Sequence, residues 1–69
     1  MTTVLATYEN RDKTIIIKVM DDTTYHISRD GKPVQRFDMT KWYYNGYGVM
    51  RHIENDIKAG YYPGVSKVS

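Results

Sequence analysis

A chain of 69 residues with a formal net charge of +2 can form one small domain, with little room for an elaborate active site. Its ten basic and eight acidic side chains alternate in sign, which favours a solvated surface over a dedicated nucleic-acid-binding face. The absence of cysteine excludes disulfides, thiolate metal sites and thiol nucleophiles. Without a leader-like segment or a long apolar run, we expect a cytoplasmic protein with no membrane contact.

The first half of the chain is patterned as strands. Residues 3–8, 13–20 and 23–28 alternate apolar with polar side chains, as half-buried strands do, and a fourth strand is expected at residues 33–37. Their predicted core-facing side chains are Val4, Ala6, Tyr8, Ile15, Ile17, Val19, Tyr25 and Ile27.

An Asp-Gly pair at residues 30–31 predicts a tight hairpin, because both residue types tolerate the positive φ that such a turn requires. A two-residue turn would set Ile27 opposite Val34 and Tyr25 opposite Arg36, which matches the apolar faces better than a longer turn ending at the glycine. We therefore expect the two-residue register.

The second half changes to helical spacing. Residues 48–60 place Val49, Met50, Ile53 and Ile57 on one side, and Gly60 can end the helix in a left-handed conformation. The predicted outer face carries Arg51, His52, Glu54, Asn55 and Lys58.

A short helical turn is expected before the main helix. Asp38 can cap it, Met39, Trp42 and Tyr43 would share one side, and the Asn45-Gly46 pair would end it.

These elements predict one α+β domain, a four-stranded antiparallel meander with a C-terminal helix packed on one face. Because Pro33 lacks an N–H group, the fourth strand should lie at an edge of the sheet. From about residue 64 we expect a polar tail that is mobile unless a partner holds it.

The sequence contains no catalytic signature. His26 and Ser28 should share a solvated strand face, and the Asp21-Asp22 pair suits a turn. His52 and Asp56 could present two ligands to a metal, but a zinc site requires three or four. We therefore predict no enzyme activity, metal or cofactor.

The abundant aromatic residues are the candidate for function. Tyr8, Tyr25 and Phe37 are expected to be structural. In the segment 41–48, we expect Trp42 to pack inward while the glycines turn the backbone so that tyrosines face outward. The candidate binding surface is Lys41, Trp42, Tyr43, Tyr44, Tyr47, Arg51, Tyr61 and Tyr62.

Three interpretations follow. The favoured one is a non-catalytic module that binds a larger protein, as an accessory regulator or inhibitor of the kind that phages and mobile elements encode. The alternative is a small nucleic-acid-binding protein whose rings stack on bases. In that case the phosphate contacts would come from Lys13, Lys18, Arg36, Lys41 and Arg51. The third is a homo-oligomer formed through the edge strand or the tyrosines.

Overall fold

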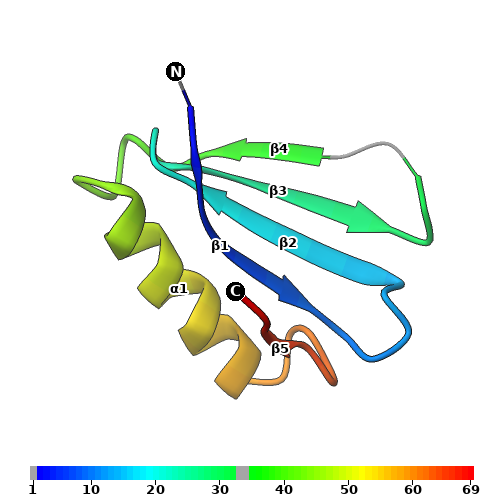
Figure 1. Ribbon diagram of the computed structural model, residues 1–69. Coiled ribbons are helices and arrows are strands. Elements are labelled where there is room, and N and C mark those ends of the chain that lie inside the picture. Colours follow the sequence, from blue (N-terminus) through cyan, green and yellow to red (C-terminus); the bar gives the residue numbers. More distant parts are fainter. Residues whose placement is uncertain (1, 33–34) are drawn as a thin grey trace.

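A computed structural model describes residues 2–32 and 35–69 and has an antiparallel sheet covered on one face by a helix (Figure 1). The described elements are β1 (Val4–Glu9), β2 (Ile15–Met20), β3 (Thr24–Arg29), β4 (Gln35–Asp38), α1 (Gly46–Lys58) and β5 (Ser66–Lys67). The strand order is β4-β3-β2-β1-β5, so each of the first four strands pairs with its neighbour in sequence. The predicted α+β class and the packed C-terminal helix are confirmed.

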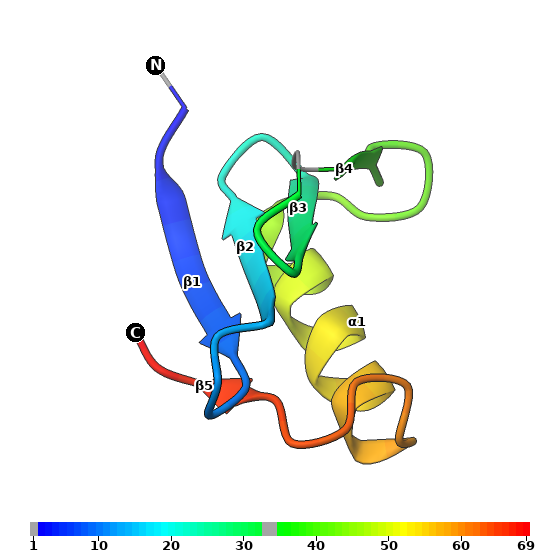
Figure 2. The ribbon, with the colours of Figure 1, turned by 90° about the vertical axis from the view of Figure 1, so that its right-hand side faces the viewer.

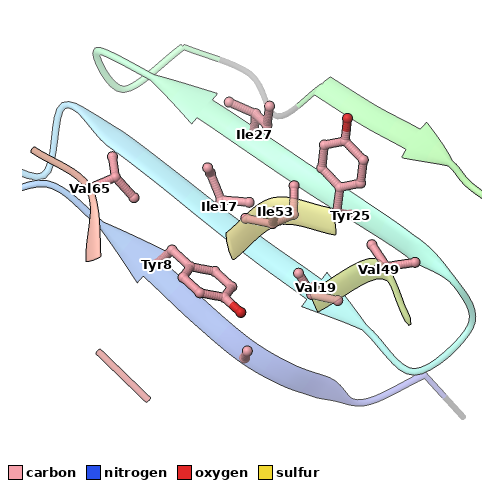
Figure 3. Packing of buried hydrophobic residues seen from close by; sticks show 9 residues of the cluster. Tyr8, Ile17, Val19, Tyr25, Ile27, Val49, Ile53 and Val65 are labelled. Atoms are coloured by element: carbon pink, nitrogen blue, oxygen red, sulfur yellow. The ribbon is translucent and has the colours of Figure 1, made fainter. Parts of the chain in front are cut away.

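The core lies between α1 and the sheet (Figures 2 and 3). Ala6 and Tyr8 from β1, and Ile17 and Val19 from β2, are buried on the helix-facing side, as their alternation predicts. Ile53 of α1 is fully buried against them. The Tyr8 hydroxyl donates a hydrogen bond of 2.9 Å to the Glu54 carboxylate. Burial, and to a smaller extent this hydrogen bond, raise the pKa of Tyr8 far above its ordinary value.

Helix α1 begins and ends with side-chain and backbone caps. The Asn45 side chain accepts from the Gly48 N–H at 3.2 Å, so Asn45 caps the start of α1. The prediction that the Asn45-Gly46 pair ends the preceding turn is therefore wrong. At the other end Gly60, with φ of 90°, follows the cap residue Ala59 and stops the helix as expected. Gly60 N–H donates to the Ile57 carbonyl, and Tyr61 N–H to the Asp56 carbonyl, as in a Schellman motif.

The predicted register of the last hairpin is wrong by one residue. The turn itself is as expected, with positive φ at Asp30 and Gly31 and a bond of 2.9 Å from the Lys32 N–H to the Arg29 carbonyl. However, β3 and β4 pair Tyr25 with Phe37, not with Arg36.

The reason for this register is aromatic packing. It places the Phe37 ring on the helix-facing side, where it stacks on Tyr25 with centroids 4.9 Å apart. Ile27 consequently lies opposite Gln35 rather than Val34. Strand β4 is at the sheet edge, as predicted, while Pro33 and Val34 themselves lie outside the described residues.

Two further predictions fail at the ends of the chain. Val4 does not share the core face of Ala6, because the register of β1 against β2 shifts between them and leaves Val4 exposed. The segment after residue 64 is not a detached tail, because Val65 is buried and β5 pairs with β1. The Val68 N–H and the Ser69 carbonyl bond to the backbone of Thr7 at 2.9 and 3.1 Å.

Candidate functional site

The connection between β4 and α1 presents large aromatic rings to solvent. Trp42 is 69% exposed, Tyr44 fully exposed and Tyr47 67% exposed. These three rings and Tyr43 occupy the connection and the first turn of α1, and are called the aromatic surface below. Lys41 beside Trp42, and Arg51 one helical turn after Tyr47, are exposed as well and flank it with positive charge.

The prediction that Trp42 packs inward is wrong. Residues 39–43 form a single turn, in which the N–H groups of Trp42 and Tyr43 both bond to the Met39 carbonyl at 3.0 Å. Asp38 caps this turn through Thr40, whose N–H and hydroxyl lie 3.0 and 2.7 Å from its Oδ1, and these bonds hold the pKa of Asp38 below its usual value.

Adjacent residues in a helical turn point in directions about 100° apart, so Trp42 and Tyr43 cannot both face inward. Met39 and Tyr43, four residues apart, pack against the core, and Trp42 is left outside.

Tyr43 is fixed in place by polar contacts as well as by packing. Its hydroxyl lies 3.0 Å from His52 Nδ1, and His52 Nε2 lies 3.3 Å from an Asp56 carboxylate oxygen. The predicted outward position of His52 is thus wrong, since it is half-buried against the Tyr43 and Tyr25 rings. Among the described residues no third acidic or histidine side chain completes a metal-ligand group there.

The two glycines have a different role from the predicted one. Neither Gly46 nor Gly48 has a positive φ. Instead they leave space, because a Cβ at Gly48 would come within 2.9 Å of the Tyr43 ring, and one at Gly46 would meet Leu5 and the Met20 backbone. Gly48 therefore lets the Tyr43 ring lie against the first turn of α1.

A shallow hollow of about 330 Å³ adjoins the aromatic surface, lined by Met39, Trp42, Tyr43 and His52. Its lining is predominantly apolar and is held by the hydrogen bonds of Tyr43 and Asp38. Tyr43, His52 and Asp56 form a linear series of polar contacts, in which the bond to His52 fixes the half-buried Tyr43 ring. The Tyr43, His52 and Asp56 contacts thus hold the wall of the hollow in one arrangement.

Tyr61 and Tyr62 lie at the opposite end of α1, roughly 18 Å away at 1.5 Å of rise per residue, so the predicted surface divides into two. Tyr61 is exposed, whereas Tyr62 is half-buried beneath Arg29, whose guanidinium carbon lies 5.9 Å from the ring centroid. Burial, and to a smaller extent the charge of Asp56, raise the pKa of Tyr62.

The basic residues proposed for phosphate contacts are also divided. Lys18 and Arg36 lie on the sheet face away from α1, with His26 between them in cross-strand register. Lys41 and Arg51 lie beside the aromatic surface, and Lys13 lies in the β1–β2 turn.

The helix-distal sheet face and the turns otherwise match the expectations. His26 and Ser28 share that face with Ile16 and Lys18, around a hollow of about 260 Å³. Asp22 accepts from the Thr24 N–H and hydroxyl, as a turn residue does, and the hydroxyl bond lowers its pKa.

Over the described residues, no helix has the length and apolar character needed to cross a bilayer. Comparison with family models, curated proteins and solved structures found no match to this chain. The surface must therefore be interpreted from its own chemistry.

Proposed function

We propose that the chain is a non-catalytic protein-binding module, an accessory regulator that contacts a larger protein through the aromatic surface. The single observation that carries this proposal is the exposure of Trp42, Tyr44 and Tyr47 at 69%, 101% and 67% on one short stretch of the molecule. The cysteine-free sequence fits a reducing compartment, and we propose a cytoplasmic location.

A protein partner fits this surface because exposed Trp and Tyr rings are the residues most enriched in interface hot spots. The anchoring of Tyr43 by His52, and of the preceding turn by Asp38, lowers the ordering cost that binding would otherwise carry. Lys41 and Arg51 at the rim would favour an acidic surround on the partner.

The nucleic-acid alternative is less well supported because of where the cations lie. Only Lys41 and Arg51 of the five candidate cations adjoin the aromatic surface. Two phosphate contacts give a shallow salt dependence, whereas six to ten would lower affinity about 10³-fold or more between 50 and 200 mM salt.

The test compares single alanine variants at matched exposed rings. Trp42→Ala and Tyr44→Ala remove rings of the aromatic surface, and Tyr61→Ala removes an equally exposed ring at the other end of α1. A partner is first captured from native lysate with and without nuclease, then purified and titrated against each variant. We expect a loss of about 2 kcal/mol, roughly 30-fold in affinity, for Trp42→Ala, and no change for Tyr61→Ala.

Equal affinity of all three variants and the wild type would contradict the proposed surface. Titration with single- and double-stranded oligonucleotides at two salt concentrations tests the alternative. Tight binding that weakens steeply with salt would favour nucleic acid over protein as the partner.

A further inference from the structure

Strand β4 is an edge strand with an open outer side. All four of its residues, Gln35–Asp38, are exposed, and it is the terminal strand of the sheet order. Phe37 is 37% exposed although it stacks on Tyr25. An edge of this kind is a template for pairing with another strand.

The direction of the β4 backbone groups follows from the pairing with β3. Met39 N–H donates to the Thr23 carbonyl at 2.9 Å. In an antiparallel ladder, residue pairs that exchange hydrogen bonds alternate with pairs that do not, so Tyr25 and Phe37 exchange bonds as well. The intervening residue of β4, Arg36, and likewise Asp38, therefore direct their N–H and C=O groups away from β3.

The other side of β3 gives the same result. Asp30 N–H donates to the Thr14 carbonyl at 2.7 Å, so the even-numbered residues of β3 direct their backbone N–H and C=O groups toward β2. The backbone groups of Tyr25 and Ile27 therefore point toward β4. Two independent hydrogen bonds thus agree that Arg36 and Asp38 present the open backbone edge.

We propose that β4 pairs with β4 of a second copy of this chain, antiparallel about a two-fold axis at Phe37. In this register Arg36 lies opposite Asp38 of the second copy, and Asp38 opposite its Arg36. These are the residues whose backbone groups point outward, so each opposed pair exchanges both hydrogen bonds. The proposal is independent of the proposed function of the aromatic surface.

The side chains are complementary in the same register. Arg36 and Asp38 are two residues apart, so their side chains point to one face of the sheet. Each guanidinium then faces the carboxylate of the other copy, and the two-fold axis gives two such pairs. Asp38 Oδ1 holds Thr40, and Oδ2 can accept from the guanidinium. On the helix-facing side Phe37 meets its own copy in a non-hydrogen-bonded pair, the closer of the two pair types, and this extends the stack from Tyr25.

Charges on edge strands often prevent such pairing, because a row of like charges repels its own copy. In β4 the two charges have opposite sign at a spacing of two, which is attractive in this antiparallel register. The charge pattern therefore selects a second copy as the occupant of the edge.

The test is a charge exchange followed by sedimentation equilibrium at about 10 µM to 1 mM protein, the range expected for a small interface. We expect the wild type to dimerise. Arg36→Asp and Asp38→Arg should each weaken self-association at least about tenfold, because two attractions become two repulsions. An equimolar mixture of the two variants should form a heterodimer of about wild-type affinity, since opposite charges then face each other again.

Lys18→Asp makes the same charge change as Arg36→Asp on the same sheet face but on β2, and should leave dimerisation unchanged. If Asp38→Arg unfolds through loss of the Thr40 bonds, Arg36→Pro provides the second measurement, because it removes an outward N–H without touching the β3 ladder. It should abolish the dimer while the circular dichroism spectrum stays native.

A wild type that remains monomeric at 1 mM would overturn the proposal and leave the edge to a strand of another protein. A dimer unaffected by Arg36→Asp and Arg36→Pro, or a mixture that does not restore association, would overturn it as well.

Discussion

Replacing Gly46 with alanine should destabilise the protein, although glycine-to-alanine changes in helices ordinarily stabilise by about 0.5–1 kcal/mol. Gly46 is the buried first residue of α1. A Cβ added there would lie 2.6 Å from the Met20 carbonyl oxygen and against a Leu5 methyl group. Ordinary carbon–oxygen contacts are about 3.3–3.6 Å, so the start of α1 must retreat by roughly 0.7 Å or more.

Such overpacking costs about 1–3 kcal/mol, and the gain in helix propensity offsets part of it. We expect a net loss of about 1–2 kcal/mol, which lowers the melting temperature by roughly 5–15 °C in a domain of this size. Urea and thermal unfolding followed by circular dichroism measure both values.

Gly48→Ala is the matched control within the same helical turn. There the nearest atoms to the added Cβ belong to the Tyr43 side chain, at 2.9 Å, and not to the backbone. A small shift of that ring, at some cost to its bond with His52, relieves the contact, so the loss should be smaller. A Gly46→Ala variant as stable as the wild type, or more stable, would refute the close approach of α1 to the β2–β3 turn.

Three other perturbations test the packing, the hairpin and the tyrosine environments. Ile53→Ala should cost about 2–5 kcal/mol in urea unfolding, because the side chain is fully buried between α1 and the sheet; a loss below 1 kcal/mol would contradict that packing. Gly31→Val should cost about 1–2 kcal/mol, because φ is 71° and nothing lies within 4 Å of the added Cβ, so the cost is backbone strain alone; an unchanged melting temperature would rule this turn out. In alkaline titration by phenolate absorbance, Tyr8, Tyr25 and Tyr62 should ionise later than in the urea-unfolded chain, since burial is the first cause that raises each pKa. Because these pKa values are raised in the folded state, the contribution of the protonated tyrosines to the free energy of unfolding is fully present below pH 10 and is lost above it. Titration curves that coincide for the folded and unfolded chains would contradict the burial.

Elements with a strong local pattern were predictable from the sequence. The alternation of Ile15, Ile17 and Val19 predicts β2 and its buried face, because one side of a strand must face the core. The spacing of Val49, Ile53 and Ile57 predicts α1 in the same way, although its start at Gly46 was missed. In both elements, local periodicity and burial agree.

Features that depend on distant contacts were not predictable. Ser66 and Lys67 form β5 only because β1 offers them an edge, and two residues carry no period of their own. The hairpin register is decided by the stacking of Phe37 on Tyr25, which alternation within one strand does not reveal.

The same limit applies to the candidate site. Either Trp42 or Tyr43 could have faced inward, and the choice depends on His52, nine residues after Tyr43 in sequence. The tyrosine-rich pattern predicted a contact surface, but it could not indicate that the surface divides between the two ends of α1.

The pairing of β5 with β1 makes the two edges of the sheet unequal. On the β1 side, β5 pairs with Tyr8 and Glu9, and Val68 and Ser69 bond to the backbone of Thr7, whereas β4 is the terminal strand on the other side. A sheet with two regular edges can add copies at both ends and grow into a fibre, but one with a single self-matching edge stops after one addition. If β4 pairs with its own copy as proposed, the short C-terminal strand acts as a terminator at the other edge, and its removal is expected to let the dimers associate further through β1.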